Sequence, residues 1–134
     1  AALERTDGIA LLVTGRGHAE RAPSALSNRR SYAMLGERLH AGFVTYHIMT
    51  YALTGAQIRS FSDPEPSPFE RCGTFPPDNM VTRLCELGDE PTLLLLDPAA
   101  RDERVWFGRS PVYLGRSWDA VLVLPVVSVQ AELR

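Results

Sequence analysis

The sequence predicts an α/β fold with a mixed, mostly parallel sheet and helices packed on it. Residues 9–13 and 92–96 are short apolar runs, typical of strands buried on both faces. Residues 29–40 and 78–87 instead repeat apolar side chains at helical spacing. Strands that alternate with amphipathic helices are typical of α/β proteins.

The first predicted strand, residues 9–13, is followed by a glycine turn. Gly15 and Gly17 allow a sharp bend just past the strand's carboxyl end. A helix is then predicted over about 29–40, with Ser27 or Asn28 as its N-cap. Gly36 lies inside this helix, where glycine costs about 1 kcal/mol relative to alanine, so we expect a close approach to the sheet or to a ligand.

The middle of the chain predicts two strands and a long connection. Gly42 ends the helix, and residues 43–51 are rich in β-branched and aromatic residues on both faces, which favours an interior strand. Thr54 and Gly55 predict a turn, after which residues 56–61 would return as a short antiparallel strand. The proline-rich stretch 62–77 predicts a lid, a linker or a long connection.

Two elements follow this connection. Asp78 predicts the N-cap of a helix that Gly88 ends. Residues 92–96 form the second strand expected to be fully buried, and Asp97 closes it. The favoured interpretation of Asp97 is a cap on the short helical turn 98–103.

The last segment combines an aromatic loop with a closing strand. Trp106 and Tyr113 belong to a stretch expected to be a loop that packs down, and they could also line a pocket. Residues 118–124 predict the final strand. Pro125 removes a backbone donor, so any continuation of the strand to residue 129 should lie at an edge or stop there.

Length and composition indicate one soluble globular domain. The 134 residues suit a single α/β domain or a half-domain, with the connection at 62–77. The net charge is −2, and we attribute an all-arginine basic set to codon usage, so a nucleic-acid partner is not expected. The apolar runs are too short to cross a bilayer, so no membrane partner is expected. Because the chain starts at Ala1 without an initiator Met, we expect a processed or trimmed product, or a piece of something longer.

The two cysteines lie in different contexts. Cys72 lies in the proline-rich stretch, and Cys85 belongs to a predicted helix. They could pair in an oxidising compartment, but no signal peptide is visible, so reduced thiols and a cytoplasmic location are expected.

His18 is the first candidate for chemistry. It follows the glycine turn at a predicted strand end, the edge where α/β sheets carry their ligands. His47 is more readily explained as a core histidine with satisfied hydrogen bonds than as a site residue. The spacing of His18, His40 and His47 is not typical of a zinc site, so no metal is predicted.

Several strings, taken in order, resemble the carboxyl-terminal half of the erythromycin esterase family, within a superfamily that includes the ChaN-like haem-binding and TraB-like proteins. The matching strings are LLVTGRGH, MLGERL, FVTYHIMTYALTGAQIRSF, PSPFERC, TLLLLDPAA and SWDAVLVL. The ordered series covers most of the chain. Gly15 stands where the esterases have a further histidine, so the turn is closer to the GxGH string of the other two branches.

The resemblance implies an active-site or ligand-facing role for His18. For an esterase or lactonase, His18 would act as general base, Arg16 would stabilise the oxyanion, and Glu20 or Asp97 would orient the imidazole. The family's amino-terminal half, with its Glu and His that help to activate water, has no counterpart here. A homodimer or a missing amino-terminal half could complete the site.

Two other classes of function remain open. A non-catalytic ligand-binding module could hold haem, with His18, His47 or a tyrosine as axial ligand. Under the esterase hypothesis no cofactor is needed, and the partner is a small-molecule substrate. A structural or interaction domain is the third interpretation. The candidate ligand-binding residues are Gly15, Gly17, His47, Trp106 and Tyr113.

Overall fold

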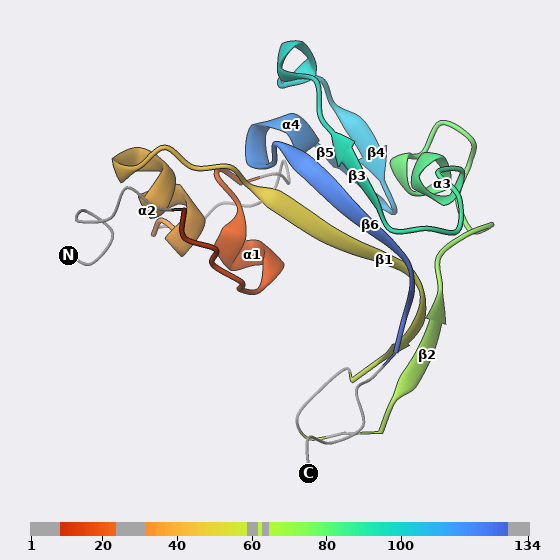
Figure 1. Ribbon diagram of the computed structural model, residues 1–134. Helices are drawn as coiled ribbons and strands as arrows, with labels where there is room; N and C mark the ends of the chain where they lie inside the picture. Colours follow the sequence, from red (N-terminus) through yellow and green to blue (C-terminus); the bar gives the residue numbers. More distant parts are fainter. Residues whose placement is uncertain (1–8, 24–31, 59–61, 63–64, 129–134) are drawn as a thin grey trace.

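The structure is a computed structural model that describes residues 9–23, 32–58, 62 and 65–128. Its main feature is a four-stranded sheet in the order β2-β1-β6-β3 (Figure 1). The strands are β1 (Ile48–Gln57), β2 (Ser67–Glu70), β3 (Thr92–Leu95) and β6 (Ala120–Val127).

The chain combines helices and strands around a mixed sheet, as predicted, but the prediction of a mostly parallel sheet is wrong. Among the described strands of this sheet, only β1 and β6 pair in parallel, whereas β2 pairs with β1, and β3 with β6, in antiparallel fashion. The reason is connectivity. A parallel neighbour needs a crossover connection, and the short path from β1 to β2 allows only a return in the opposite direction.

The remaining elements are short. Four helices are described: α1 (Arg16–Ala19), α2 (Leu35–Gly42), α3 (Met80–Cys85) and α4 (Leu114–Ser117). A 3-10 turn, η2 (Pro98–Ala100), follows β3, and β4 (Val105–Phe107) pairs with β5 (Ser110–Val112) in a separate hairpin. The aromatic stretch predicted as a loop is therefore a β-hairpin with a turn at Gly108, whose φ is +62°.

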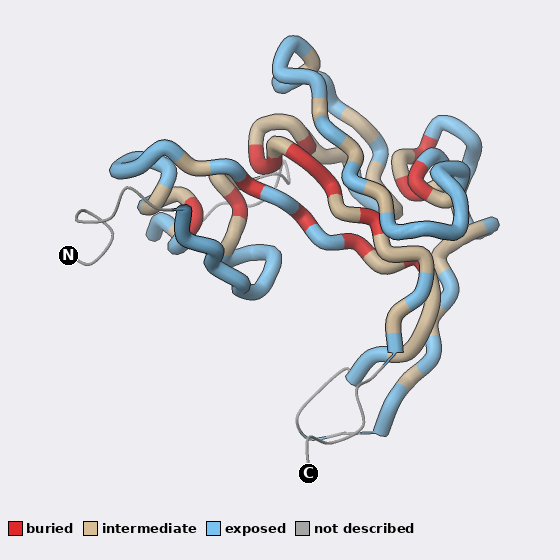
Figure 2. Tube along the Cα trace, in the orientation of Figure 1, coloured by how far each residue is buried: buried red, intermediate tan, exposed pale blue. Residues whose placement is uncertain are grey.

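The core lies on one face of the sheet. Alternate residues of β1 and β6 point to this face, and α3, α4 and Trp118 pack against them. Figure 2 shows buried and exposed positions alternating along β1. The buried apolar residues that form this core are Met49, Tyr51, Leu53, Val81, Leu84, Leu114, Trp118, Val121 and Val123.

In the described part of the chain, the opposite face of the sheet carries several exposed apolar side chains. Ile48 of β1 lies opposite Ala120, and Leu93 and Leu95 of β3 lie opposite Leu122 and Ala120, so these side chains share one face. Leu93 is 49% and Leu95 is 65% exposed. Leucine side chains in an α/β sheet are normally covered on both faces. Here the described elements pack against the core face and leave Leu93 and Leu95 on the other face partly exposed.

The first predicted strand is wrong. Residues 9–13 have neither helix nor strand, with Ile9 103% and Val13 85% exposed. The composition indicates strand propensity, but a strand forms only where another strand pairs with it. The second apolar run does form β3, although at the sheet edge, so its predicted burial on both faces is also wrong.

Helix α2 tests the predictions made for Gly42 and Gly36. The helix begins at Leu35, later than expected, and it ends at Gly42 as predicted; the predicted N-cap residues 27 and 28 lie outside the described residues. A Cβ on Gly36 would lie 2.5 Å from the carbonyl oxygen of Glu20. Gly36 does allow a close backbone approach, but its neighbour is the end of α1, so the predicted approach to the sheet or to a ligand is wrong.

The predicted strand 43–51 begins later than expected, and the turn predicted at Thr54 and Gly55 is wrong. Strand β1 begins at Ile48 and continues through Thr54 and Gly55, so no turn forms there. Gly55 has φ +138° and its backbone packs directly against Val127 of β6, a contact that any side chain would obstruct. The interior position of this strand, between β2 and β6, is confirmed.

Predictions for the later elements are mostly confirmed. The predicted N-cap Asp78 is wrong by one residue, because Asn79 caps α3 by accepting a hydrogen bond from the Val81 N–H, and the helix ends at Cys85, before Gly88. Asp97 accepts one from the Ala99 N–H, which is the predicted cap. Strand β6 does pass Pro125, but β3 pairs only with residues 120–123, so the proline lies where that side of β6 is unpaired.

The expectation of reduced thiols is wrong, because Cys72 and Cys85 form a disulfide. Cys72 lies just after β2, and Cys85 ends α3, so the bond ties the helix to the second strand. The stretch 62–77 thus contains a strand and the start of a covalent link. None of the helices in the described residues could span a membrane.

We expect the disulfide to stabilise the fold. Replacing both cysteines by serine should lower the free energy of unfolding by about 3 kcal/mol, because the crosslink restricts the unfolded chain. Urea unfolding of the wild-type protein with and without reductant measures this difference. The double variant is the control, since reductant should leave its unfolding midpoint unchanged.

Candidate functional site

The Asp119 carboxylate joins three parts of the chain at the start of the parallel pair. Its Oδ1 accepts a hydrogen bond from Arg21 Nη1 at 2.6 Å, within an ion pair. Its Oδ2 accepts one from the backbone N–H of His47 at 2.8 Å, just before β1. The backbone N–H of Asp119 donates in return to the His47 carbonyl at 2.8 Å.

Arg21 attaches the segment after α1 to α4. Its guanidinium donates to the carbonyls of Arg116 and Gly115 at 3.1 and 2.8 Å. The Arg21 N–H donates to the Ser117 carbonyl at 3.1 Å, and the Ser117 hydroxyl donates to the carbonyl of Ala22. These bonds fix the path of the chain leaving α1, although α1 has only four residues.

His47 is buried and fully hydrogen-bonded, which confirms the structural interpretation predicted for it. It is 8% exposed, and its Nδ1 lies 2.8 Å from the Ala19 carbonyl, which can only accept. Nδ1 therefore carries the proton, and in the neutral ring Nε2 accepts from the Thr45 hydroxyl at 2.8 Å. Thr45 Oγ1 lies 3.0 Å from His40 Nδ1, so a continuous polar chain runs from exposed His40 to α1.

The GRGH turn forms α1 instead of following a strand. Gly15 is the N-cap residue, and Arg16, Gly17 and His18 are exposed. Glu20 comes directly after the helix and is buried. The structure thus presents the Arg16 and His18 side chains to solvent on a turn whose carboxyl end is fastened to the sheet.

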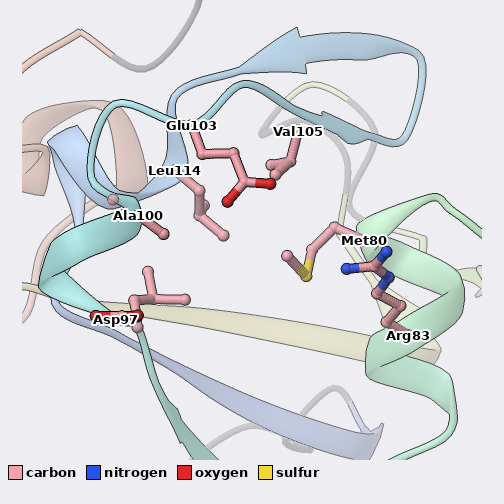
Figure 3. Close-up of a pocket in the computed structure, with 9 residues that line it drawn as sticks. Met80, Arg83, Asp97, Ala100, Glu103, Val105 and Leu114 are labelled. Carbon is pink, nitrogen blue, oxygen red and sulfur yellow. The ribbon is translucent and has the colours of Figure 1, made fainter.

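A small cavity lies on the core side of the sheet, at the carboxyl end of β3. Its volume is about 120 Å³. Figure 3 shows Met80 and Leu114 facing into it from different elements, and the Glu103 carboxylate turned toward it. The complete lining is Met80, Arg83, Leu96, Asp97, Ala100, Glu103, Val105, Leu114 and Gly115.

The cavity combines an apolar wall with charged groups at its rim. Asp97 already holds the η2 turn through its Oδ1. Glu103 and Arg83 are exposed, with no ion pair between them. The arrangement could take a small, partly apolar group, with Glu103 as a hydrogen-bond acceptor.

The predicted site residues fall into two groups. Gly15, Arg16, Gly17, His18 and Glu20 are contiguous in and around α1, and His47 bonds to this segment through Ala19. Asp97 instead lines the cavity, which His18 does not.

The two aromatic candidates lie outside the lining of this cavity. Trp106 of β4 is half exposed. Tyr113 precedes α4, and the Arg116 guanidinium stacks 3.8 Å from its ring centre. Their hairpin neighbour Val105 and the helix residue Leu114 contribute to the cavity instead.

Sequence reasoning missed Arg21, Thr45 and Asp119 as organising residues. The aromatic-acid pair Trp118-Asp119 before the last strand was the available signal. Within the described residues, no three or more His, Cys, Asp or Glu side chains come together in a way that could hold a metal ion.

Comparison with known proteins adds no assignment: no family model, no curated protein and no solved structure matches this chain.

We expect Asp119→Asn to lower the free energy of unfolding by about 2–3 kcal/mol, because it leaves the buried Arg21 guanidinium without its counter-charge. Asp102→Asn is the matched control. It removes a carboxylate from the exposed pair with Arg116, which should cost at most about 0.5 kcal/mol. Urea unfolding measures both, and equal losses would contradict the proposed role of Asp119.

Stability should also fall as the pH is lowered through about 6.5. Desolvation, followed by electrostatic interactions with Arg21, His47 and Arg101, lowers the pKa of His40 from its ordinary 6.5, although Asp119 opposes this. The unfolded chain therefore binds a proton more readily than the folded one, which destabilises the fold on acidification. Chemical unfolding at pH 7.5 and 5.5 measures the effect, and His40→Gln should reduce the difference.

A second loss is expected at lower pH. Burial raises the pKa of Asp119, but the hydrogen bonds from His47 and Arg21 and the Arg21 charge outweigh it, so the net pKa lies below the ordinary 3.8. The stability that this carboxylate contributes is present above pH 3.8 and is lost as the pH falls through its folded pKa.

Proposed function

We propose that this chain contributes part of the active site of an esterase-type hydrolase that acts on an ester or lactone, with His18 as general base. The single observation that carries the proposal is the placement of His18. Its side chain is exposed on a turn whose backbone is held by Ala19, Arg21 and their partners. A catalytic base must be accessible to substrate and held in a defined position.

The chemistry assigned to the turn is addition of water to a carbonyl carbon. His18 takes a proton from the water as its oxygen bonds to that carbon. Arg16, two residues earlier and also exposed, stabilises the resulting oxyanion. On collapse, the bond to the leaving alkoxide breaks, and the alkoxide takes the proton from the imidazolium.

The described residues supply only part of such a site. A general base is effective when a carboxylate orients it, as in hydrolytic triads. Among the acidic residues nominated for this role, Glu20 is buried after α1, and Asp97 lies at the separate cavity. The proposal therefore requires a further protein surface beside α1.

An interaction domain is the second candidate function, because one apolar face of the sheet is uncovered in the described part of the chain. Apolar surface of this kind commonly marks a protein interface. The haem-binding alternative has no comparable support. The disulfide favours an oxidising compartment over the cytoplasmic location expected from the sequence.

The hydrolase proposal predicts a specific loss of activity. The protein should hydrolyse p-nitrophenyl esters or a macrocyclic lactone, and His18→Ala should reduce the rate about 10²–10⁴-fold because the general base is removed. His40→Gln is the matched control, since this exposed histidine has no assigned role in the chemistry. Initial rates with purified protein provide the measurement, and a His18→Ala rate equal to wild type would refute the assignment.

A further inference from the structure

The polar chain that runs from His40 to the end of α1 has a defined proton at each step. His47 Nδ1 lies 2.8 Å from the Ala19 carbonyl oxygen, which can only accept, so Nδ1 carries a proton. When this ring is neutral, its Nε2 has only a lone pair and accepts the hydrogen bond from Thr45 Oγ1 at 2.8 Å. The single proton of the Thr45 hydroxyl is therefore donated to His47.

This arrangement decides which nitrogen of His40 is protonated. Thr45 Oγ1 also lies 3.0 Å from His40 Nδ1. Because the hydroxyl proton is already donated to His47, the oxygen can only accept here, and His40 Nδ1 is the donor. In the neutral protein both rings thus carry their proton on Nδ1. Nε2 of the exposed His40 has a lone pair, with no hydrogen-bond partner in the described part of the chain.

One added proton can be held at either end of this chain of hydrogen bonds. It first binds the lone pair of His40 Nε2, which makes the exposed ring positive. The Nδ1–H bond of His40 can then break as that proton bonds to Thr45 Oγ1, while the original O–H bond of Thr45 breaks and its proton bonds to His47 Nε2. The positive charge has then moved to the buried ring, and electrons are neither gained nor lost. Histidine is the usual side chain in such proton transfers near neutral pH.

Two added protons suit the chain less well than one. The centroids of the two rings are 5.7 Å apart, and two positive rings at this distance repel each other. Both rings would also donate to Thr45 Oγ1, which leaves the hydroxyl proton without its present acceptor. We therefore expect the pair of histidines to take up a first proton well before a second.

Charged side chains from the elements packed around the pair act on its protonation. They are the cations Arg21 and Arg101 and the carboxylates Glu20, Glu37 and Asp119. Asp119 attracts a positive charge on either ring, whereas the two arginines oppose a charge on His40. Glu20 and Glu37 have interactions of their own. Asp119 is therefore the carboxylate that balances a proton held by the pair.

We propose that His40, Thr45 and His47 form a proton relay, which carries one proton between solvent and the buried His47 and so makes the attachment of α1 respond to pH. The bond from His47 to the Ala19 carbonyl becomes charge-assisted, and hence stronger, when this ring is positive. The exposed end of the relay lies on α2, so protonation of α2 acts on α1. The relay is independent of the proposed hydrolase function, because it uses none of the residues assigned to that chemistry.

Nitrogen NMR of the histidine rings tests the proton positions without any measurement of activity. In long-range ¹H–¹⁵N spectra at about pH 8, His40 and His47 should both show a protonated Nδ1 and an unprotonated Nε2. Exposed His18, which is not part of the relay, serves as the reference and should show the mixed tautomers of a free ring. A proton on Nε2 of neutral His40 or of neutral His47 would overturn the proposal.

A pH titration of the same spectra tests proton transfer. Between about pH 8 and pH 5, the nitrogen signals of both rings should move with one shared midpoint, because the rings hold one proton jointly. Thr45→Val removes the hydroxyl and should separate the two midpoints by at least about one pH unit. Thr45→Ser keeps a hydroxyl and should keep the shared midpoint. Wild-type His47 signals that do not follow those of His40, or a shared midpoint in Thr45→Val, would contradict the relay.

His40→Gln gives a second test, which holds even if Thr45→Val does not fold. The glutamine amide can donate to Thr45 but cannot take up and pass on a proton. The His47 ring should therefore stay neutral across the whole titration. A His47 midpoint equal to that of wild type would show that its proton arrives by another route, and the relay would then be wrong. Circular dichroism shows which variants are folded.

The Ala19 carbonyl reports whether the transferred proton acts on α1. Its ¹³C resonance should move with the midpoint of the two rings in wild type and in Thr45→Ser, because the hydrogen bond from His47 strengthens. In His40→Gln the resonance should stay in place over the same pH range. A wild-type Ala19 signal that does not change as the rings titrate would overturn the link between the relay and α1.

Discussion

The position of the amino-terminal segment depends on one half-buried carboxylate. Asp119 binds the Arg21 guanidinium with one oxygen and the His47 N–H with the other, so a single side chain sets the spacing between β1, β6 and the chain leaving α1. Around it, His47 bonds to the Ala19 carbonyl, and Arg21 bonds to α4. The very short helix α1 is therefore held by contacts of its neighbours, since four residues gain little stability from helix formation itself.

Local features of the fold could be predicted from the sequence because local chemistry determines them. Asp97 caps a turn and Gly42 ends a helix. Pro125 lies in the part of β6 that β3 does not pair with. Strand pairing could not be predicted in the same way. Residues 9–13 and β3 have similar composition, yet only β3 has a partner in the sheet. Propensity identifies a segment that can form a strand, while long-range geometry decides whether it does.

The same distinction applies to the candidate site. Individual residues such as His18 and His47 could be nominated from their types and neighbours, and His47 proved to be structural. The link between Arg21 and Asp119 spans almost the whole described chain, and Arg21 lies in no recognisable motif. The sequence could not predict that Asp97 lies apart from the α1 turn either. This separation arises because β3 pairs with β6 on the side away from β1.

The covalent bond between Cys72 and Cys85 also bears on the cavity. Met80 and Arg83 form one of its walls, and both belong to α3, the helix that Cys85 ends. Asn79 holds the other end of that helix to the hairpin by bonding both polar backbone groups of Gly108. In a chain with free thiols, α3 would be held by non-covalent contacts alone, the Asn79 bonds at its beginning and the packing of Val81 and Leu84 in the core. The shape of the cavity, and with it the affinity for a ligand, would then depend on the redox potential of the compartment.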